Sequence, residues 1–190
     1  MRLGDTVLQS WRIRKASPYI PVGAHVLDIG CSDGALFRVL RDRIASGIGI
    51  DTDAVPSDYG RFRFIRGPAP GGLPVGSTFD AITLLAVLEH IPPSAQRELA
   101  VSCAGLLKLG GRLICTVPSP KVDSLIHLGQ QLGLLDGIAE HEHYGFEPSQ
   151  TVRLFIDRGF TLQRASRFQL GLNNLFVFVN AGVGPPPRNH

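Results

Sequence analysis

The sequence has 190 residues, which favours one domain of ordinary size, and apolar residues make up 44% of it, so global disorder is excluded. The formal net charge of +3 is too small to argue for a nucleic-acid partner. No apolar run reaches the roughly 18 residues that a membrane span needs, so no stable membrane insertion is expected.

Residues 6–17 have the spacing of an amphipathic helix, which Pro18 and Pro21 end. Its apolar residues are expected to face the core, and they are Val7, Leu8, Trp11 and Ile13. Its basic residues are expected to face solvent, and they are Arg12, Arg14 and Lys15.

The next stretch, residues 24–53, has the pattern of a strand, a glycine turn, a helix and a second strand. The first apolar run ends at Gly30, and the second ends at Asp51. Two parallel strands need a crossover connection, which the helix between them supplies. Because ligands of open parallel sheets bind beyond the carboxyl ends of the strands, we expect the binding site at this turn.

Acidic residues distinguish this turn from a dinucleotide site, where a pyrophosphate lies on the helix N-terminus. Asp28 and Asp33 flank the turn and would repel a pyrophosphate, but they suit a cation. Asp51, at the end of the second strand, suits two ribose hydroxyls. A ligand with a ribose, a positive charge and no phosphate fits these acids.

Further along the chain, residues 61–66 alternate in polarity and predict an outer strand, whose arginines either protect an edge or attract an acidic substrate. Residues 67–78 are rich in proline and glycine and predict a loop. The remaining elements are strands at 79–85 and 112–117, a helix from Pro92-Pro93 to Leu109-Gly110-Gly111, a helix at 148–158, and final strands at 160–169 and 175–179.

The motif VLDIGCSDG, followed by GIGID, resembles the first two motifs of class I S-adenosylmethionine-dependent methyltransferases. FDAITLLAVLEHIPP and LLKLGGRLICTVPSP are similar to later motifs of that superfamily, in its small-molecule branch of the ubiquinone/menaquinone-biosynthesis type (methyltransferase type 11). The resemblance covers residues 22–180. The chain departs from the pattern in two places: Ser32 stands at the usual central glycine, and no acid follows the third strand, where Gly67 and Pro68 stand instead.

The resemblance implies an α/β fold, a Rossmann-like, doubly wound three-layer sandwich whose seven-stranded, mainly parallel sheet ends in an antiparallel hairpin. Residues 1–184 are expected to form a single methyltransferase domain, followed by a mobile tail at 185–190. Residues 118–147 are expected to be a substrate-covering insertion, and its apolar residues predict an apolar or amphiphilic acceptor. Ordinary packing on the flank of the domain is the alternative.

The resemblance also implies S-adenosyl-L-methionine as the cofactor. The expected cofactor-binding residues are Asp28, Gly30, Cys31, Ser32, Gly34, Asp51, Thr52, Asp53 and Leu85. A metal site loosely resembling that of small-RNA 2′-O-methyltransferases is not expected, because Ala86 stands where that family has a second glutamate.

Two histidines are candidates for catalysis. His90 lies beside the expected methyl position, and its ordinary pKa near neutrality suits proton transfer from a hydroxyl or an amine. The alternative is that His90 caps the next helix or shapes the pocket. His143 is expected, with His141 and Tyr144, to line the substrate pocket; the alternative is a solvent-facing loop.

The predicted function is methylation of an oxygen, nitrogen or carbon of a small molecule, and the alternative is a non-catalytic cofactor-binding module or partner subunit. Nucleic-acid and protein substrates are disfavoured by the modest charge and the absence of a basic domain. The sequence LAVLEH stands after the fourth strand in place of an N-P-P-Y-type motif, which also argues against an adenine-amino or glutamine methyltransferase. Cys31, Cys103 and Cys115 lack metal-ligand spacing, and the N-terminus lacks a signal-peptide core, which predicts a cytoplasmic protein. A monomer or a homodimer is expected.

Overall fold

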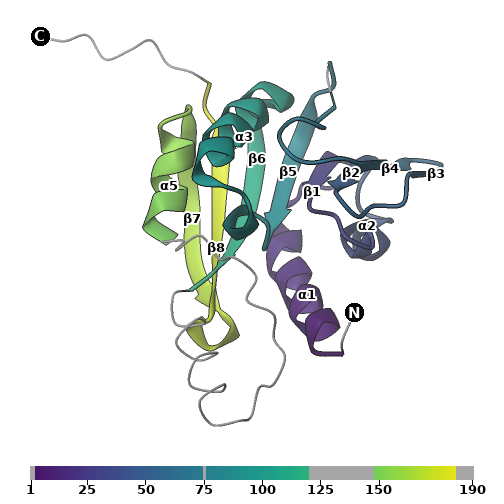
Figure 1. The fold of residues 1–190 in the computed structure, drawn as a ribbon, viewed down its shortest axis with the longest axis horizontal. Helices are drawn as coiled ribbons and strands as arrows, with labels where there is room; N and C mark the ends of the chain where they lie inside the picture. Colours follow the sequence, from purple (N-terminus) through teal and green to yellow (C-terminus); the bar gives the residue numbers. More distant parts are fainter. Residues whose placement is uncertain (1–2, 75, 120–147, 183–190) are drawn as a thin grey trace, which may run out of the picture.

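A computed structural model describes residues 3–74, 76–119 and 148–182 (Figure 1). One eight-stranded sheet lies at its centre. In sheet order the strands are β3 (Ser57–Tyr59), β4 (Phe62–Arg66), β2 (Ser46–Asp51), β1 (His25–Ile29), β5 (Phe79–Leu85), β6 (Leu107–Pro118), β8 (Asn173–Asn180) and β7 (Phe160–Phe168).

The central strands β4, β2, β1, β5 and β6 are parallel, while β8 runs antiparallel to β6 and β7. The expected mainly parallel α/β sheet with a final antiparallel hairpin is therefore confirmed. The expected number of seven strands was one too low, because Ser57–Tyr59 pairs antiparallel with β4. For the same reason β4 is not an edge strand, and its arginines do not guard the sheet edge.

Helices cover both faces of the sheet (Figure 1). The helix α1 (Leu3–Ala16) and the short helix α2 (Ala35–Leu40) pack on one face, while α3 (Pro93–Leu106) and α5 (Pro148–Ile156) pack on the other. Single 3₁₀ turns lie at η1 (Ser17–Tyr19), η2 (Leu88–His90) and η3 (Gln169–Gly171). The helix α3 ends at Leu106, before the expected Leu109-Gly110-Gly111 stop, because β6 already begins at Leu107.

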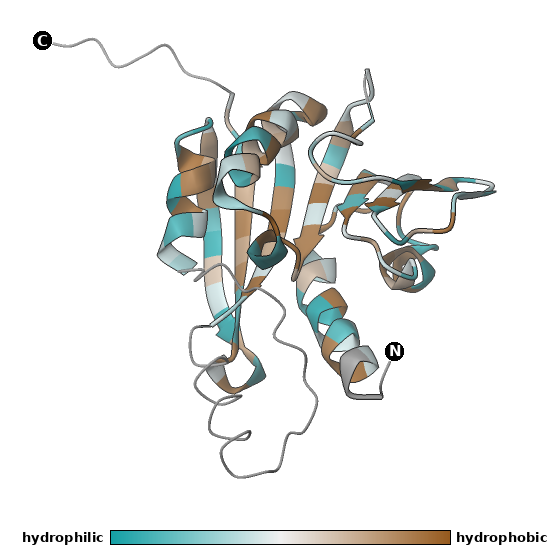
Figure 2. Cartoon of the chain, viewed as in Figure 1, coloured by the Kyte–Doolittle hydropathy of each residue, from teal (hydrophilic) through white to brown (hydrophobic). Residues whose placement is uncertain are grey.

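Alternate residues of each central strand enter two different cores. Leu27 and Ile29 pack with residues of α3 and α5, whereas Val26 packs with residues of α1 and α2. The strands therefore need apolar residues on both faces, and Figure 2 shows the central strands as mostly hydrophobic. This double burial explains why these strands appear in the sequence as short continuous apolar runs.

The expected orientation of α1 was right for Ile13, Arg14 and Lys15 but wrong for Val7, Leu8, Trp11 and Arg12. Val7 is 53% exposed and Trp11 is 47% exposed, while Ile13 and Ala16 are buried. Arg12, expected to face solvent, lines a cavity at the sheet edge. The inward face of the helix is set by its contacts with the rest of the fold and includes only some of its apolar residues.

Two further expectations fall outside the described residues: most of the insertion at 118–147, and the tail at 185–190. Within residues 3–74, 76–119 and 148–182, every helix is too short or too polar to cross a lipid bilayer.

Gly34→Ala tests the close packing at the start of α2. Gly34 has a left-handed φ of +74°, and a Cβ there would lie 2.6 Å from Phe64 Cζ. The left-handed conformation costs about 1–2 kcal/mol and the overlap about 1–3 kcal/mol. We expect urea denaturation to show a free energy of unfolding that is lower by about 2–5 kcal/mol.

Gly60→Ala is the matched control, because Gly60 has a φ of +65° and open space where the Cβ would stand. It should lose only the conformational part, about 1–2 kcal/mol. Equal losses in the two variants would contradict the packing constraint between Gly34 and Phe64.

Candidate functional site

The turn that follows β1 is held close to β2 by its backbone. The N–H groups of Gly30 and Cys31 both donate to the carbonyl oxygen of Ile50, at 2.8 and 3.2 Å. Gly30 has a φ of +76°, and a Cβ there would lie 2.2 Å from Val87 Cγ2. Glycine is therefore required by both the backbone conformation and the neighbouring side chain.

Asp51 joins the turn to the loop after β2. Its Oδ2 accepts a hydrogen bond from the backbone N–H of Ser32 at 2.9 Å, and its Oδ1 accepts one from Asp53 N–H at 3.0 Å. Ser32 has a φ of +47°, a left-handed conformation that explains why glycine is usual at this position. Each carboxylate oxygen of Asp51 retains a lone pair for a ligand hydroxyl.

Asp28 is a buried acid, with 4% of its surface exposed. Thr83 Oγ1 donates a hydrogen bond to its Oδ1 at 2.7 Å. Burial raises the pKa of Asp28 to about 7; the Thr83 hydrogen bond opposes this shift, and the nearby charge of Asp51 adds to it. A cation placed beside Asp28 would favour its charged form.

Asp33, unlike Asp28, is hydrogen-bonded to a basic side chain, that of Arg38. Burial acts to raise its pKa, but hydrogen bonds from Arg38 and Gln9 hold the pKa of Asp33 below its usual value. Gln9 Nε2 donates to Asp33 Oδ1 at 3.1 Å, which ties α1 to the turn.

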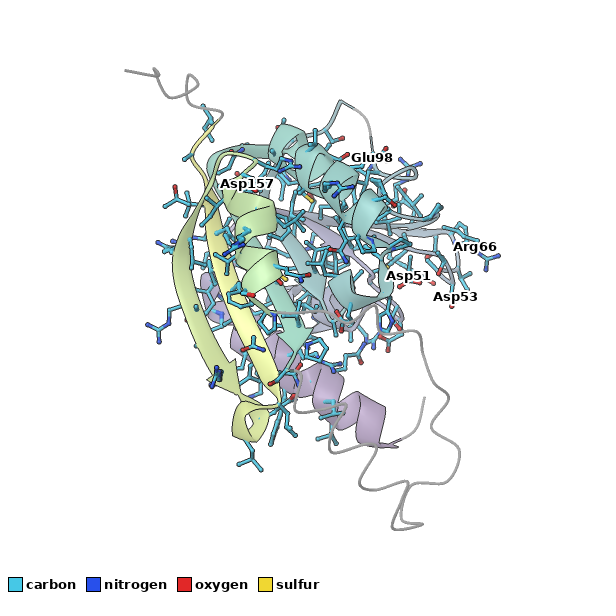
Figure 3. All side chains as sticks on the ribbon, turned by 60° about the vertical axis from the view of Figure 1, so that its left-hand side comes forward. Asp51, Asp53, Arg66, Glu98 and Asp157 are labelled. Carbon is cyan, nitrogen blue, oxygen red and sulfur yellow. The ribbon has the colours of Figure 1, made fainter. Side chains whose placement is uncertain are left out.

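Two cavities adjoin the turn. The smaller, of about 40 Å³, is lined by Gln9, Arg12, Ile13, Asp28, Gly30, Cys31, Leu36 and Leu85. The larger, of about 580 Å³, is lined by Ser32, Asp33, Asp51, Asp53, Ala54, Val55, Ser57, Tyr59 and Phe64. Figure 3 shows Asp51, Asp53 and Arg66 gathered in one region, away from Glu98 and Asp157.

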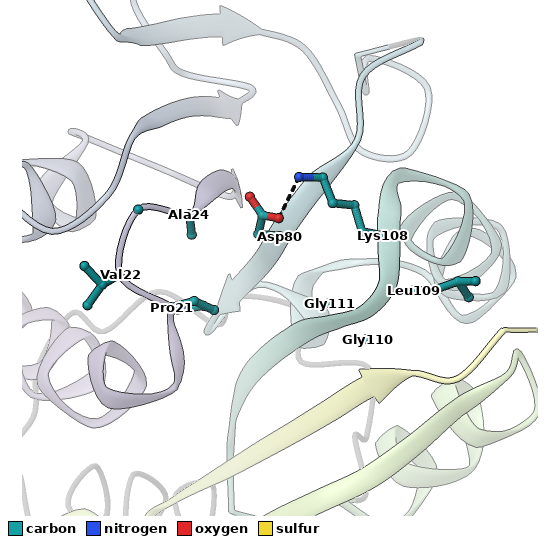
Figure 4. A pocket seen from close by; sticks show the side chains of 9 residues that line it. Pro21, Val22, Ala24, Asp80, Lys108, Leu109, Gly110 and Gly111 are labelled. Carbon is teal, nitrogen blue, oxygen red and sulfur yellow. Dashed lines mark hydrogen bonds and ion pairs between the residues drawn. The ribbon is translucent and has the colours of Figure 1, made fainter.

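A third cavity, of about 300 Å³, lies at the opposite edge of the sheet, near the starts of β1 and β5 (Figure 4). Its polar feature is an ion pair of 2.7 Å between Lys108 Nζ and Asp80 Oδ1. Asp80 Oδ2 also accepts a hydrogen bond from the backbone N–H of His25. These contacts join β1, β5 and β6, so the polar side chains of this cavity have a structural role in the sheet.

The turn η2 presents Glu89 to the interior and His90 to solvent. Glu89 is 3% exposed, and its buried Oε2 has no hydrogen-bond partner among the described residues. Burial raises the pKa of Glu89 to about 7, although a backbone hydrogen bond and the charge of Arg12 act to lower it. A buried, incompletely paired carboxyl group beside the site is a candidate for chemistry.

The structure brings most of the predicted cofactor residues to one edge of the sheet. Asp28, Gly30, Cys31 and Leu85 line the smaller cavity, and Ser32, Asp51 and Asp53 line the larger one. Gly34 caps α2, while Thr52 is exposed and lines neither cavity.

The candidate catalytic residue His143, with His141 and Tyr144, lies outside the described residues. Across the described part of the chain, no group of three His, Cys, Asp or Glu side chains is placed to hold a metal ion.

Sequence reasoning missed Gln9 and Arg12 as site residues and Glu89 as the inward-facing acid. One signal was available for Glu89: neighbouring residues of a tight turn point in different directions, so Glu89 and His90 were not both to be expected at the same site. The sequence carried no comparable local signal for Arg12, because its neighbours in the site lie far away along the chain.

Comparisons with known proteins agree with this geometry. A family model described as a methyltransferase domain matches residues 6–165. Ubiquinone biosynthesis O-methyltransferase of Psychrobacter arcticus is 29% identical over 159 residues, 74% of this chain and 60% of that protein. The protein of the same name in Stutzerimonas stutzeri is 30% identical over 105 residues, 48% of this chain and 43% of that protein. The chain spans less than two thirds of the length of these curated relatives.

Solved structures show the same fold at low sequence identity. The 1,6-didemethyltoxoflavin-N1-methyltransferase of Burkholderia thailandensis, with bound 1,6-didemethyltoxoflavin and S-adenosylhomocysteine, has a TM-score of 0.72 at 19% identity, covering 94% of this chain and 80% of that chain. The N-methyltransferase NodS of Bradyrhizobium japonicum has a TM-score of 0.66 at 15% identity, covering 95% of this chain and 100% of that chain.

Asp28→Asn tests the burial of the acid. Asparagine keeps an acceptor for Thr83 but removes the titration. The folded-state pKa of Asp28 lies above its unfolded value, so the folded protein binds the proton more tightly. Stability should therefore fall as pH rises from about 4 to about 7, with a slope of up to about 1.4 kcal/mol per pH unit.

The variant should be more stable than the wild type by about 2 kcal/mol or more at pH 8, and close to it at pH 4.5, as measured by urea denaturation. Glu89 titrates in the same range, so some pH dependence remains. The exposed Asp42→Asn is the control and should follow the wild type. An Asp28→Asn protein with the wild-type pH profile would show that Asp28 does not titrate as described.

Proposed function

The chain belongs to the family of methyltransferase domains, whose cofactor is S-adenosyl-L-methionine, and we propose that it transfers a methyl group to an oxygen, nitrogen or carbon nucleophile of a small molecule. The observation that carries the proposal is the glycine turn with Asp28 on one side and Asp51 on the other. The alternative, a non-catalytic binding module, lacks a specific observation in its favour.

The residues around the turn fit the cofactor. Gly30 and Cys31 line the smaller cavity, and the next residue, Ser32, lines the larger one, so the two cavities adjoin along the turn. The positive charges of the cofactor suit Asp28, and its ribose hydroxyls can donate to Asp51. A pyrophosphate would meet the same carboxylates, so a nicotinamide dinucleotide does not fit.

Held by residues of the turn and by Asp51, the cofactor would supply an activated methyl group for an in-line displacement with sulfur as the leaving group. The protein then has two tasks, to orient the acceptor and to take its proton where it carries one. We assign the second task to Glu89, because its Oε2 is buried without a hydrogen-bond partner among the described residues and burial raises its pKa. His90, which is exposed, remains the alternative base, and the role of His143 stays a prediction.

Several finer points are part of the same proposal. The named relatives are O-methyltransferases, which favours a hydroxyl acceptor. The apolar or amphiphilic character of the acceptor rests on residues 118–147 and stays a prediction. Buried free thiols at Cys31, Cys103 and Cys115 support a cytoplasmic location, and a monomer or homodimer remains the expected state.

Asp51→Asn tests the site. The variant keeps the shape of the side chain but loses the charge, so S-adenosylhomocysteine should bind about 10–100-fold more weakly, in line with about 1.5–3 kcal/mol for hydrogen bonds to a charged group. Calorimetric titration measures the affinity. The exposed Asp42→Asn should bind like the wild type. Unchanged affinity in Asp51→Asn would remove Asp51 from the cofactor site.

Catalysis is tested by transfer of labelled methyl from S-adenosylmethionine to a panel of phenols, quinone precursors, amines and sugars. The wild type should label at least one acceptor, and Glu89→Gln should reduce turnover of a hydroxyl acceptor about 10²-fold or more while leaving cofactor affinity within a few-fold. Cofactor binding without transfer to any acceptor would favour the binding-module alternative.

A further inference from the structure

The helix α1 carries apolar side chains on the face that it turns to solvent. Val7, Leu8 and Trp11 are all exposed. Their i, i+1, i+4 spacing places them on one face of the helix. Ile13 and Ala16 of the same helix are buried in the core instead. The exposed stripe is therefore not explained by the packing of the domain.

A strained turn adds a fourth exposed apolar side chain. In η3, Gln169 has a φ of +51° and Leu170 has a φ of +56°, left-handed conformations that cost free energy in residues other than glycine. The side chain of Gln169 is buried and hydrogen-bonded to Asn173, which explains its position. The side chain of Leu170 is fully exposed. A strained residue that holds an apolar side chain in solvent is a candidate for contact with a partner.

The same turn lies against α1. Gln169 Nε2 donates to the carbonyl oxygen of Leu8 at 3.4 Å, which joins η3 to the part of the helix that carries the stripe. Figures 1 and 3 both show the turn between β7 and β8 at the same end of the molecule as the N-terminal half of α1. The four exposed residues form what we call the apolar surface: Val7, Leu8, Trp11 and Leu170.

Basic residues continue from the apolar surface on both of its elements. Arg14 and Lys15 are exposed about one helical turn after Trp11. Arg167 is exposed three positions before Leu170. Residues 6–27 contain no aspartate or glutamate, and neither do residues 158–182. The surface therefore combines apolar side chains with positive charge.

This combination separates the possible occupants of the surface. A second copy of the chain would bring the same basic residues together, and their repulsion would oppose a symmetric dimer. The interface of an anionic lipid bilayer would instead receive the apolar side chains and attract the basic ones. Trp11 suits this position, because a tryptophan ring combines an apolar body with a polar N–H group.

We propose that the apolar surface docks onto an anionic lipid bilayer, with α1 lying in the plane of the interface and Leu170 entering the lipid beside it. Docking of this kind differs from crossing the membrane, since only one face of the helix enters the lipid. The inference does not depend on the proposed function. Gln9 and Ile13 of α1 line the smaller cavity, so docking brings that cavity close to the lipid.

Sedimentation of the full chain with lipid vesicles tests the proposal. Wild-type protein should bind vesicles made of equal parts of phosphatidylcholine and phosphatidylglycerol. It should bind pure phosphatidylcholine vesicles at least about 5-fold more weakly, and added salt should weaken the binding to anionic vesicles. Leu170→Asn and Trp11→Ser should each weaken that binding about 10-fold, the lower end for burial of one large apolar side chain.

Matched variants separate docking from a general loss of structure. Asparagine adopts the left-handed backbone more readily than leucine, so Leu170→Asn should fold at least as stably as the wild type. Leu109→Asn is its control, because Leu109 is an exposed leucine beside the third cavity, at the opposite edge of the sheet. It should bind vesicles like the wild type. Arg14→Gln should weaken binding about 5-fold, whereas Arg97→Gln, at an exposed position of α3, should not.

Three outcomes would overturn the proposal. The first is wild-type protein that stays in solution with both kinds of vesicle. The second is vesicle binding that Leu170→Asn and Trp11→Ser leave unchanged, because the lipid contact would then lie elsewhere. The third is a wild-type protein that light scattering shows to be a dimer and that Leu170→Asn converts to a monomer, because the surface would then belong to a second copy.

Discussion

The carboxylate of Asp51 is the contact on which the site depends. It accepts hydrogen bonds from the backbone of Ser32, in the turn after β1, and of Asp53, in the loop after β2. The two strands are parallel and in register up to Ile29 and Ile50, so their ends present the turn and the acid at the same edge. The left-handed backbone of Ser32 and the close contact of Gly30 with Val87 follow from holding the turn there.

Several acidic residues lie together at this edge of the sheet, which lowers the stability of the folded protein. Asp28 and Glu89 are buried with pKa values raised to about 7, so their ionisation at neutral pH opposes folding of the ligand-free protein. Arg12 moderates the charge of Glu89, but the described structure offers Asp28 only the hydroxyl of Thr83 as a hydrogen-bond donor. A ligand that carries both a positive charge and hydroxyl groups would offset this cost. The acids that lower the stability of the free protein are therefore the groups that favour binding of such a ligand.

The sequence predicted the central strands and the acid-flanked glycine turn because both depend on local patterns: apolar runs buried on two faces, and glycine at left-handed positions. It failed where distant contacts decide. The strand β3 is only three residues long and exists through its pairing with β4. The face that α1 turns toward the site is fixed in part by the hydrogen bond between Gln9 and Asp33, which lie 24 positions apart. The choice between Glu89 and His90 depends on how η2 packs against β6.

The central claim is that this acid-flanked turn binds an adenosyl cofactor. Calorimetric titration of the wild-type protein with S-adenosylhomocysteine, with NADH as the comparison ligand, tests it most directly. The structure predicts binding of S-adenosylhomocysteine with a dissociation constant on the order of micromolar, about −8 kcal/mol, and no binding of NADH. Folded protein that binds NADH, or that binds neither ligand, would contradict the claim.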